Sequence, residues 1–156
     1  MKIREILKLE YIIPRMKANN KIDAINELIN LLENNNKVLD LEEIRDSIHN
    51  REKIMSTGVG KGFAIPHGKT KATSEILSVF GIARTPIDYQ SLDGEPVQLI
   101  FLLVGKDNMV SAHIKLLSRI SRMMNEDSFR EKLLQTETSE QILKIFREEE
   151  IKLIDH

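Results

Sequence analysis

The chain has 156 residues, of which 41% are hydrophobic and 30% are charged, with no cysteine, no tryptophan and a formal net charge of -1. This length predicts a single domain over residues 1–156, large enough to bury about 70% of its unfolded surface. The balanced charge argues against a nucleic-acid-binding protein, which usually carries a basic surface, and the lack of cysteine excludes disulfides, cysteine zinc sites and thiol catalysis.

No targeting signal is expected in the N-terminal segment. Residues 1–10, MKIREILKLE, are charged throughout and lack the apolar stretch of a signal peptide. No apolar run approaches the roughly 20 residues that a membrane-spanning helix needs. The sequence therefore predicts a cytoplasmic protein that does not insert directly into a membrane.

The first amphipathic segment covers residues 20–33. Its apolar side chains recur at the spacing of one helix face, and Asn20 is suited to cap the N-terminus of the helix. The predicted inward face consists of Ile22, Ile25, Ile29 and Leu32.

A second helix is predicted over residues 41–54. Asp40 is suited to cap it, and Glu43, three residues later, completes the pattern of a capping box. Ile44 and Ile48 lie one helical turn apart and are expected to face the core.

The middle of the chain is rich in predicted strands. Residues 75–83 (EILSVFGIA) and 96–105 (PVQLIFLLVG) are apolar at nearly every position, which is typical of strands covered by helices on both sides. Helical spacing returns over residues 111–124. A capping box at Ser128 and Glu131 then begins a short helix, and a last helix is predicted over residues 138–149. This order predicts an α/β (α+β) sandwich around one mostly buried sheet.

Residues 56–70, STGVGKGFAIPHGKT, present His67 within a glycine-rich segment. The Walker A pattern fails because Phe63 stands where its first glycine belongs, and the dinucleotide-binding pattern fails at the same residue. The four histidines show no helical spacing with a carboxylate that would predict a metal site, and there is no G-x-S-x-G motif of a serine hydrolase. These histidines are His49, His67, His113 and His156.

Two interpretations of His67 remain. A neutral imidazole can attack a phosphoryl group, and glycine-flanked backbone N–H groups can bind the phosphoryl oxygens. Pro66 restricts the backbone just before the ring and would help to orient it. The alternative is a tight turn that happens to contain a histidine, since glycine and proline are common in turns.

His113 lies in the first turn of the helix predicted over residues 111–124. It shares an inward face with Leu117, Ile120 and Met124, so it is either a core histidine or a neutral donor beside an anion at the helix N-terminus. The opposite face carries Lys115, Arg119 and Arg122.

Three cations lie close to the glycine-rich segment in sequence. Arg51, in the last turn of the second helix, has a guanidinium that could bind a phosphoryl group in bidentate fashion, although the helix dipole alone also favours arginine there. Lys61 and Lys69 add positive potential, but solvated lysines need no such role.

The segment NREKIMSTGVGKGFAIPHGKT closely resembles the enzyme IIA signature of the bacterial phosphoenolpyruvate-dependent phosphotransferase system. The type is the fructose/mannitol one, which includes the nitrogen-regulatory paralogue. The resemblance continues through PIDYQSLDGEPVQLIFLLVG and HIKLLSRISRMM, and so covers nearly the whole chain. It implies a three-layer sandwich with a mixed central β-sheet flanked by helices on both faces.

The resemblance also implies roles for individual residues. His67 would accept a phosphoryl group on Nε2 from HPr or an HPr-like protein, His113 would be the supporting histidine, and Arg51 would stabilise the phosphoryl group. No metal or other cofactor is implied. The phosphoryl pocket would be lined by Ser56, Thr57, Gly58, Gly60 and Gly68.

Two roles for such a phosphotransferase component stay open. The chain has no cysteine to serve as a IIB acceptor and no hydrophobic span of a IIC domain, so in sugar transport it would pass the phosphoryl group to a separate IIB of the fructose type. The alternative is a free-standing nitrogen-regulatory IIA, which controls target proteins through phosphorylation-dependent binding.

Overall fold

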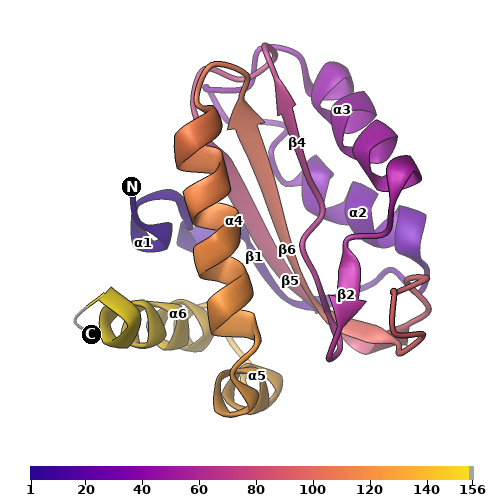
Figure 1. Ribbon diagram of the computed structural model, residues 1–156, viewed down its shortest axis with the longest axis vertical. Coiled ribbons are helices and arrows are strands. Elements are labelled where there is room, and N and C mark those ends of the chain that lie inside the picture. The colour runs from indigo at the N-terminus through magenta and orange to yellow at the C-terminus, as the bar shows by residue number, and fades with distance from the viewer. Residues whose placement is uncertain (155–156) are drawn as a thin grey trace.

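The computed structural model describes residues 1–154, and within that range the chain forms six α-helices, one 3-10 helix and a six-stranded sheet (Figure 1). His156 lies outside the described residues. The helices are α1 (Ile3–Ile6), α2 (Lys21–Asn30), α3 (Leu41–Ile54), α4 (Val110–Met124), α5 (Asp127–Leu134) and α6 (Ser139–Ile154), with the 3-10 helix η1 at Leu9–Tyr11. The strands are β1 (Ile12–Met16), β2 (Gly58–Gly60), β3 (Phe63–Ala64), β4 (His67–Thr70), β5 (Leu77–Ile87) and β6 (Val97–Lys106).

The sheet is mixed, as the family resemblance implied. Its strand order is β1-β5-β6-β3-β2, and β4 also pairs with β6. The pairs β1–β5, β3–β6 and β4–β6 are parallel, whereas β5–β6 and β2–β3 are antiparallel. The long central strand β6 therefore holds β3 and β4 one after the other along the same edge.

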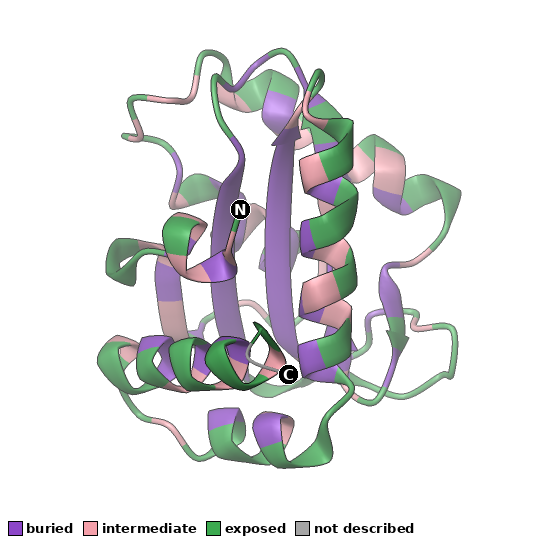
Figure 2. Ribbon diagram, turned by 60° about the vertical axis from the view of Figure 1, so that its left-hand side comes forward, coloured by how far each residue is buried: buried purple, intermediate pink, exposed green. Residues whose placement is uncertain are grey.

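The two apolar strands β5 and β6 are buried on both faces of the sheet (Figure 2). Along β6, Leu99, Phe101 and Leu103 belong to one hydrophobic cluster, and the residues between them belong to another. This alternation explains why the sequence is apolar at successive positions, because both pleat directions meet a helical layer.

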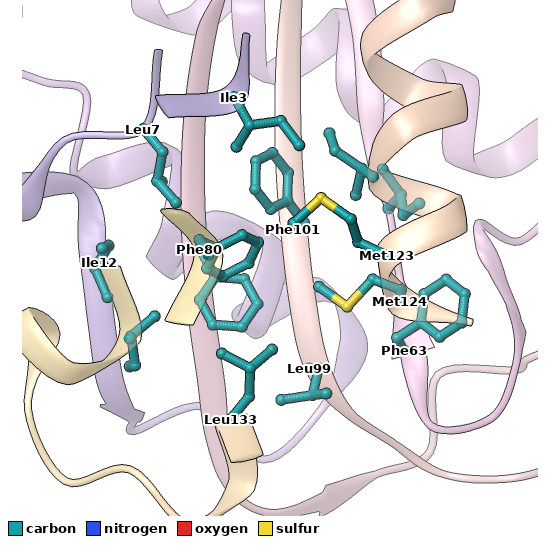
Figure 3. Close-up of a cluster of buried hydrophobic side chains, with 14 of the residues drawn as sticks. Ile3, Leu7, Ile12, Phe63, Phe80, Leu99, Phe101, Met123, Met124 and Leu133 are labelled. Carbon is teal, nitrogen blue, oxygen red and sulfur yellow. The ribbon is translucent and has the colours of Figure 1, made fainter. Parts of the chain in front are cut away.

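Each face of the sheet is covered by its own set of helices, which confirms the three-layer arrangement. Helices α2 and α3 pack on one face, and α4, α5 and α6 pack on the other together with α1. In the cluster that contains Phe101, beneath α4, α5 and α6, Phe146 meets Phe80 edge-on, with ring centroids 4.9 Å apart, and Phe129 at 5.2 Å. Figure 3 shows Phe80 and Phe101 in this cluster, with Met123 and Met124 nearby.

Both predicted N-caps at the start of the chain are confirmed. The Asn20 side chain accepts a hydrogen bond from the Asp23 N–H at the start of α2. Asp40 does the same for two N–H groups of α3, and Ile44 and Ile48 of that helix are fully buried.

Four local predictions were wrong. The first helix ends at Asn30, and Ile22 is 62% exposed because it lies at the first turn, beyond the edge of the packed face. Glu43 does not close a capping box: its carboxylate instead accepts a hydrogen bond from Thr70 Oγ1 at 3.5 Å. Ser128 is not a cap, because the Glu126 carbonyl accepts the first bond of α5 and so places Ser128 inside its first turn.

The C-terminal helix is longer than predicted and continues to Ile154. Its start agrees, since Thr138 Oγ1 accepts a hydrogen bond from the Gln141 N–H. Across residues 1–154, no helix combines the length and hydropathy needed to cross a membrane.

Candidate functional site

His67 stands at the first position of β4, which the sequence did not predict as a strand. The strand forms because residues 67–70 pair in parallel with the end of β6, a contact between segments far apart in the chain. His67 is paired with Leu103, whose side chain belongs to the cluster beneath α4. Since paired residues share a face of the sheet, the imidazole lies on the α4 side.

The tautomer of His67 is fixed by the backbone. Its Nδ1 lies 2.8 Å from the Ile65 carbonyl oxygen, and because a carbonyl can only accept, Nδ1 carries the proton. Nε2 therefore bears the lone pair. This is the nitrogen that a nucleophilic reaction of the neutral ring would use.

His113, in the first turn of α4, faces His67 with the ring centroids 5.7 Å apart. Its side chain is only 2% exposed, yet among residues 1–154 neither of its ring nitrogens has a hydrogen-bond partner. The ring lies directly on β6, since a Cβ built at Gly105 would stand 2.1 Å from His113 Nδ1. His113 is therefore buried, as a core histidine would be, and it also lies next to His67, as a partner in the site would.

Both imidazoles are held in the neutral form at pH 7. Burial lowers the pKa of His67 below 6.5, Arg51 and Lys69 act in the same direction, and the bond to Ile65 opposes them. For His113, burial and then His67 and Lys69 lower the pKa to about 4. A neutral His67 keeps its nucleophilic lone pair, and a neutral His113 has one N–H to donate.

Arg51 completes a cleft of about 530 Å³ between α3 and α4, along the start of β4. Its guanidinium donates a hydrogen bond to the Met55 carbonyl at 2.9 Å, just beyond the end of α3. Helix α3 can lie this close to β4 because position 68 is glycine: a Cβ there would stand 2.6 Å from Ser47 Oγ. The cleft is lined by Ser47, Asn50, Arg51, Ile54, His67, Gly68, Lys69, His113, Ile114 and Leu117.

The structure does not bring four of the expected pocket residues to this cleft. Ser56 Oγ donates to the Tyr89 carbonyl at 3.3 Å, and Thr57 Oγ1 donates to Glu52 at 2.6 Å. Gly58 packs against Ser91, and Gly60 lies beside Asp93. They face away because β2 turns back on β3 at the far end of the sheet edge from β4 (Figure 1). Of the predicted glycines only Gly68 lines the cleft.

Several lining residues were missed in the sequence. Ser47 and Ile54 lie four residues before and three residues after Arg51, so the helical period counted from Arg51 would have identified them. Ile54 and Ile114 are 81% and 58% exposed, and they place apolar surface on either side of the polar centre. Glu52, which lies next to Arg51 but does not line the cleft, is buried; the sequence did not predict this, because a buried glutamate is uncommon.

This arrangement suits transfer of an anionic group to nitrogen. A neutral nucleophile faces a cleft that offers a guanidinium, an imidazole N–H and the Lys69 ammonium, all of which favour negative charge. Within residues 1–154, no group of three or more His, Cys, Asp or Glu side chains is placed to hold a metal ion.

Comparison with known proteins identifies the family to which this chain belongs. The model of "Phosphoenolpyruvate-dependent sugar phosphotransferase system, EIIA 2" matches residues 5–149. The chain belongs to this EIIA 2 family. The solved IIA-Ntr of Neisseria meningitidis superimposes with a TM-score of 0.87 at 32% identity, over 92% of this chain and 98% of that one.

Two relatives of this chain carry names that point to different roles, one in fructose transport and one in nitrogen regulation. The "PTS system fructose-specific EIIABC component" of Bacillus subtilis is 33% identical over 95% of this chain, but the match spans only 23% of that protein. The "Nitrogen regulatory protein" of Bradyrhizobium diazoefficiens is also 33% identical, over 85% of this chain and 86% of its own length.

A solved complex of the mannitol enzyme IIA with phosphorylated enzyme IIB, from Escherichia coli, has the same fold. Its TM-score is 0.77 at 21% identity, over 91% of this chain and 97% of that one. At this identity the likeness concerns the fold alone.

Proposed function

We propose that this EIIA 2 protein is a phosphocarrier that accepts a phosphoryl group on Nε2 of His67. The observation that carries the proposal is the fixed Nδ1–H tautomer of a neutral His67, whose other nitrogen is left for the cleft that Arg51 and His113 line. A lone pair aimed at a site with such donors is what in-line phosphoryl transfer requires.

The transfer balances without a cofactor. HPr or an HPr-like protein brings the group as a phosphohistidine; the P–N bond to the donor breaks as the P–N bond to His67 Nε2 forms. The negative charge of the phosphoryl oxygens is met by the Arg51 guanidinium and the N–H of His113. The group then passes to a separate IIB protein of the fructose type: the P–N bond to His67 Nε2 breaks as a P–S bond forms to a cysteine thiolate of IIB, and Nε2 regains its lone pair.

Intact-mass measurement tests this proposal. The protein is incubated with phosphoenolpyruvate, enzyme I and HPr, and one added phosphoryl group that is lost in mild acid is expected. His67→Ala should gain none and should keep its fold, because the side chain is only half-buried at the edge of the sheet. His49→Ala is the matched control, since His49 lies on another face of α3 and bonds to Asn26. A His67→Ala variant that still accepts the group would overturn the assignment.

A regulatory protein of the nitrogen type is the second candidate. It is favoured by the similarity to the Bradyrhizobium nitrogen regulatory protein along 86% of that protein's length. Transfer from phosphorylated protein to an added IIB supports transport. Binding of a target protein that differs between the two phosphorylation states, without onward transfer, supports regulation.

A further inference from the structure

Glu52 is a buried carboxylate next to Arg51, 7% exposed, on the face of α3 that turns away from the cleft. It accepts hydrogen bonds from the Thr57 N–H at 2.7 Å and the Thr57 hydroxyl at 2.6 Å. The Tyr89 hydroxyl lies 3.3 Å away and the Lys21 ammonium 3.0 Å away. A carboxylate is only stable in such a position when its oxygens are met by donors, and these four supply them.

Thr57 carries this anchoring onward to His67. The Thr57 carbonyl accepts a hydrogen bond from the Ile65 N–H at 3.2 Å. The Ile65 carbonyl in turn accepts the Nδ1–H of His67 at 2.8 Å. Three hydrogen bonds therefore link Glu52 to the imidazole, each through backbone groups that have little freedom to move.

Glu52 also belongs to the turn of α3 that presents Arg51. The guanidinium is held at the end of this helix by the Met55 carbonyl, two residues before Thr57. The hydrogen bonds between Glu52 and Thr57 hold the same segment, residues 52–57, on its other side. One buried carboxylate therefore lies both beside the turn that presents Arg51 and at the start of the hydrogen-bond path that leads to His67.

We infer that Glu52 is a positioning residue, which holds His67 and Arg51 at the spacing needed for phosphoryl transfer without touching the phosphoryl group. The inference rests on the proposed phosphocarrier function. Glu52 acts through hydrogen-bond geometry: its oxygens fix Thr57, and Thr57 fixes Ile65 and the His67 tautomer.

A carboxylate suits this position better than an amide. Tyr89 is fully buried and its pKa is raised well above 10.0, by burial and then by Glu52, so its hydroxyl keeps its proton and can donate. Glutamine would turn one acceptor into a donor that competes with the donors of Thr57 and Lys21. Glu52→Gln therefore keeps the volume of the side chain, disturbs its hydrogen bonds and removes the charge that pairs with Lys21.

The chain offers a matched control in Glu150. This glutamate is 0% exposed and accepts hydrogen bonds from the backbone N–H groups of Ile3 and Arg4, with Arg119 as its cation. Its contacts lie among α1, α4 and α6, away from the residues that line the cleft. Glu150→Gln makes the same chemical change with a comparable loss of buried bonds, and because it removes the charge that pairs with Arg119, it also controls for the loss of charge.

Two measurements on the 156-residue chain test the inference. Nitrogen NMR of the imidazole rings reports the tautomer of His67 without any phosphoryl transfer. In Glu52→Gln we expect the Nδ1–H tautomer of His67 to give way to a mixture, and in Glu150→Gln to persist. Rapid-quench transfer from phosphorylated HPr gives the second readout, with the maximal rate lowered about 10-fold or more, since a misplacement of ~1 Å can cost on the order of 100-fold.

The donor concentration at half-maximal rate should stay unchanged, because Glu52 lies outside the cleft and the exposed residues that line it, including Ile54 and Ile114, are not altered. If the tautomer and the rate of Glu52→Gln match those of Glu150→Gln, Glu52 is merely structural and the inference is wrong. Should Glu52→Gln not fold, Thr57→Val removes one donor to Glu52 and must shift the same two readouts in the same direction. Failure of the wild-type protein to accept a phosphoryl group would refute the proposed function, while the NMR comparison would still decide the role of Glu52.

Discussion

The His67 cleft and the junction of the chain's two ends complete their hydrogen bonds in opposite ways. At the junction, the buried Glu150 receives two backbone N–H groups and the Arg119 guanidinium. In the cleft, His113 is almost as deeply buried, yet within residues 1–154 both its ring nitrogens lack partners. Buried polar groups are normally satisfied, so the exception indicates where stability is given up for binding or chemistry.

The same contrast separates the two sides of α3. On the side facing β2, both carboxylate oxygens of Glu52 accept hydrogen bonds from Thr57 and Tyr89. Toward β4, the same helix presents Arg51 to an open cleft. One helix thus carries an anchoring face and a reactive face, and substitutions on the two should affect different measurements.

The largest expected effect on stability is at the junction. Glu150→Ala leaves Arg119 and two N–H groups without their acceptor, and breaking such a buried pair typically costs about 3 kcal/mol or more. Urea denaturation should show this loss, while the rate of phosphoryl acceptance stays at the wild-type value at temperatures where the variant is folded. A folded variant with a slower rate would mean that the two regions are coupled.

Much of the fold could be predicted because local patterns and tertiary packing agree. The runs at 75–83 and 96–105 became β5 and β6, and the caps Asn20 and Asp40 lie where the pattern placed them. Strands β1, β2, β3 and β4 were not predicted. They are short, and β4 exists only because it pairs with a segment more than 30 residues away, which no local pattern encodes.

The site divides in the same way. His67, His113 and Arg51 could be identified by motif and resemblance, and the structure brings all three to one cleft. The family resemblance implied that Ser56 and Thr57 would line this cleft too. In the structure their side chains instead donate hydrogen bonds to the Tyr89 carbonyl and to the Glu52 carboxylate, partners that only the folded chain brings together.

Gly105→Ala tests how closely the cleft is built around His113. The new Cβ would lie 2.1 Å from Nδ1, so the ring must move, and overpacking of this kind costs about 2 kcal/mol. We expect lower stability in urea denaturation and slower transfer. In a His113→Ala background the ring is absent, and the same glycine substitution should cost less than about 0.5 kcal/mol. An equal cost in both backgrounds would show that the ring is not the obstacle.

The most gradual expected effect is a pH dependence of stability. Burial, with His67 and Lys69, lowers the pKa of His113 to about 4, against 6.5 in the unfolded chain. Between these values the unfolded state binds the extra proton, so stability is complete above pH 6.5 and falls as the pH drops toward 4, by on the order of 1 kcal/mol per pH unit.

Comparison with His113→Gln isolates this contribution. His49 and His67 also have lowered pKa values, so the difference between the wild-type and His113→Gln slopes, rather than either slope alone, reports His113. Urea unfolding at several pH values from 4 to 7 should give a flatter profile for His113→Gln. Parallel profiles would mean that the pKa of His113 is the same in the folded and the unfolded chain, so that burial in the cleft does not hold the ring neutral below pH 6.5.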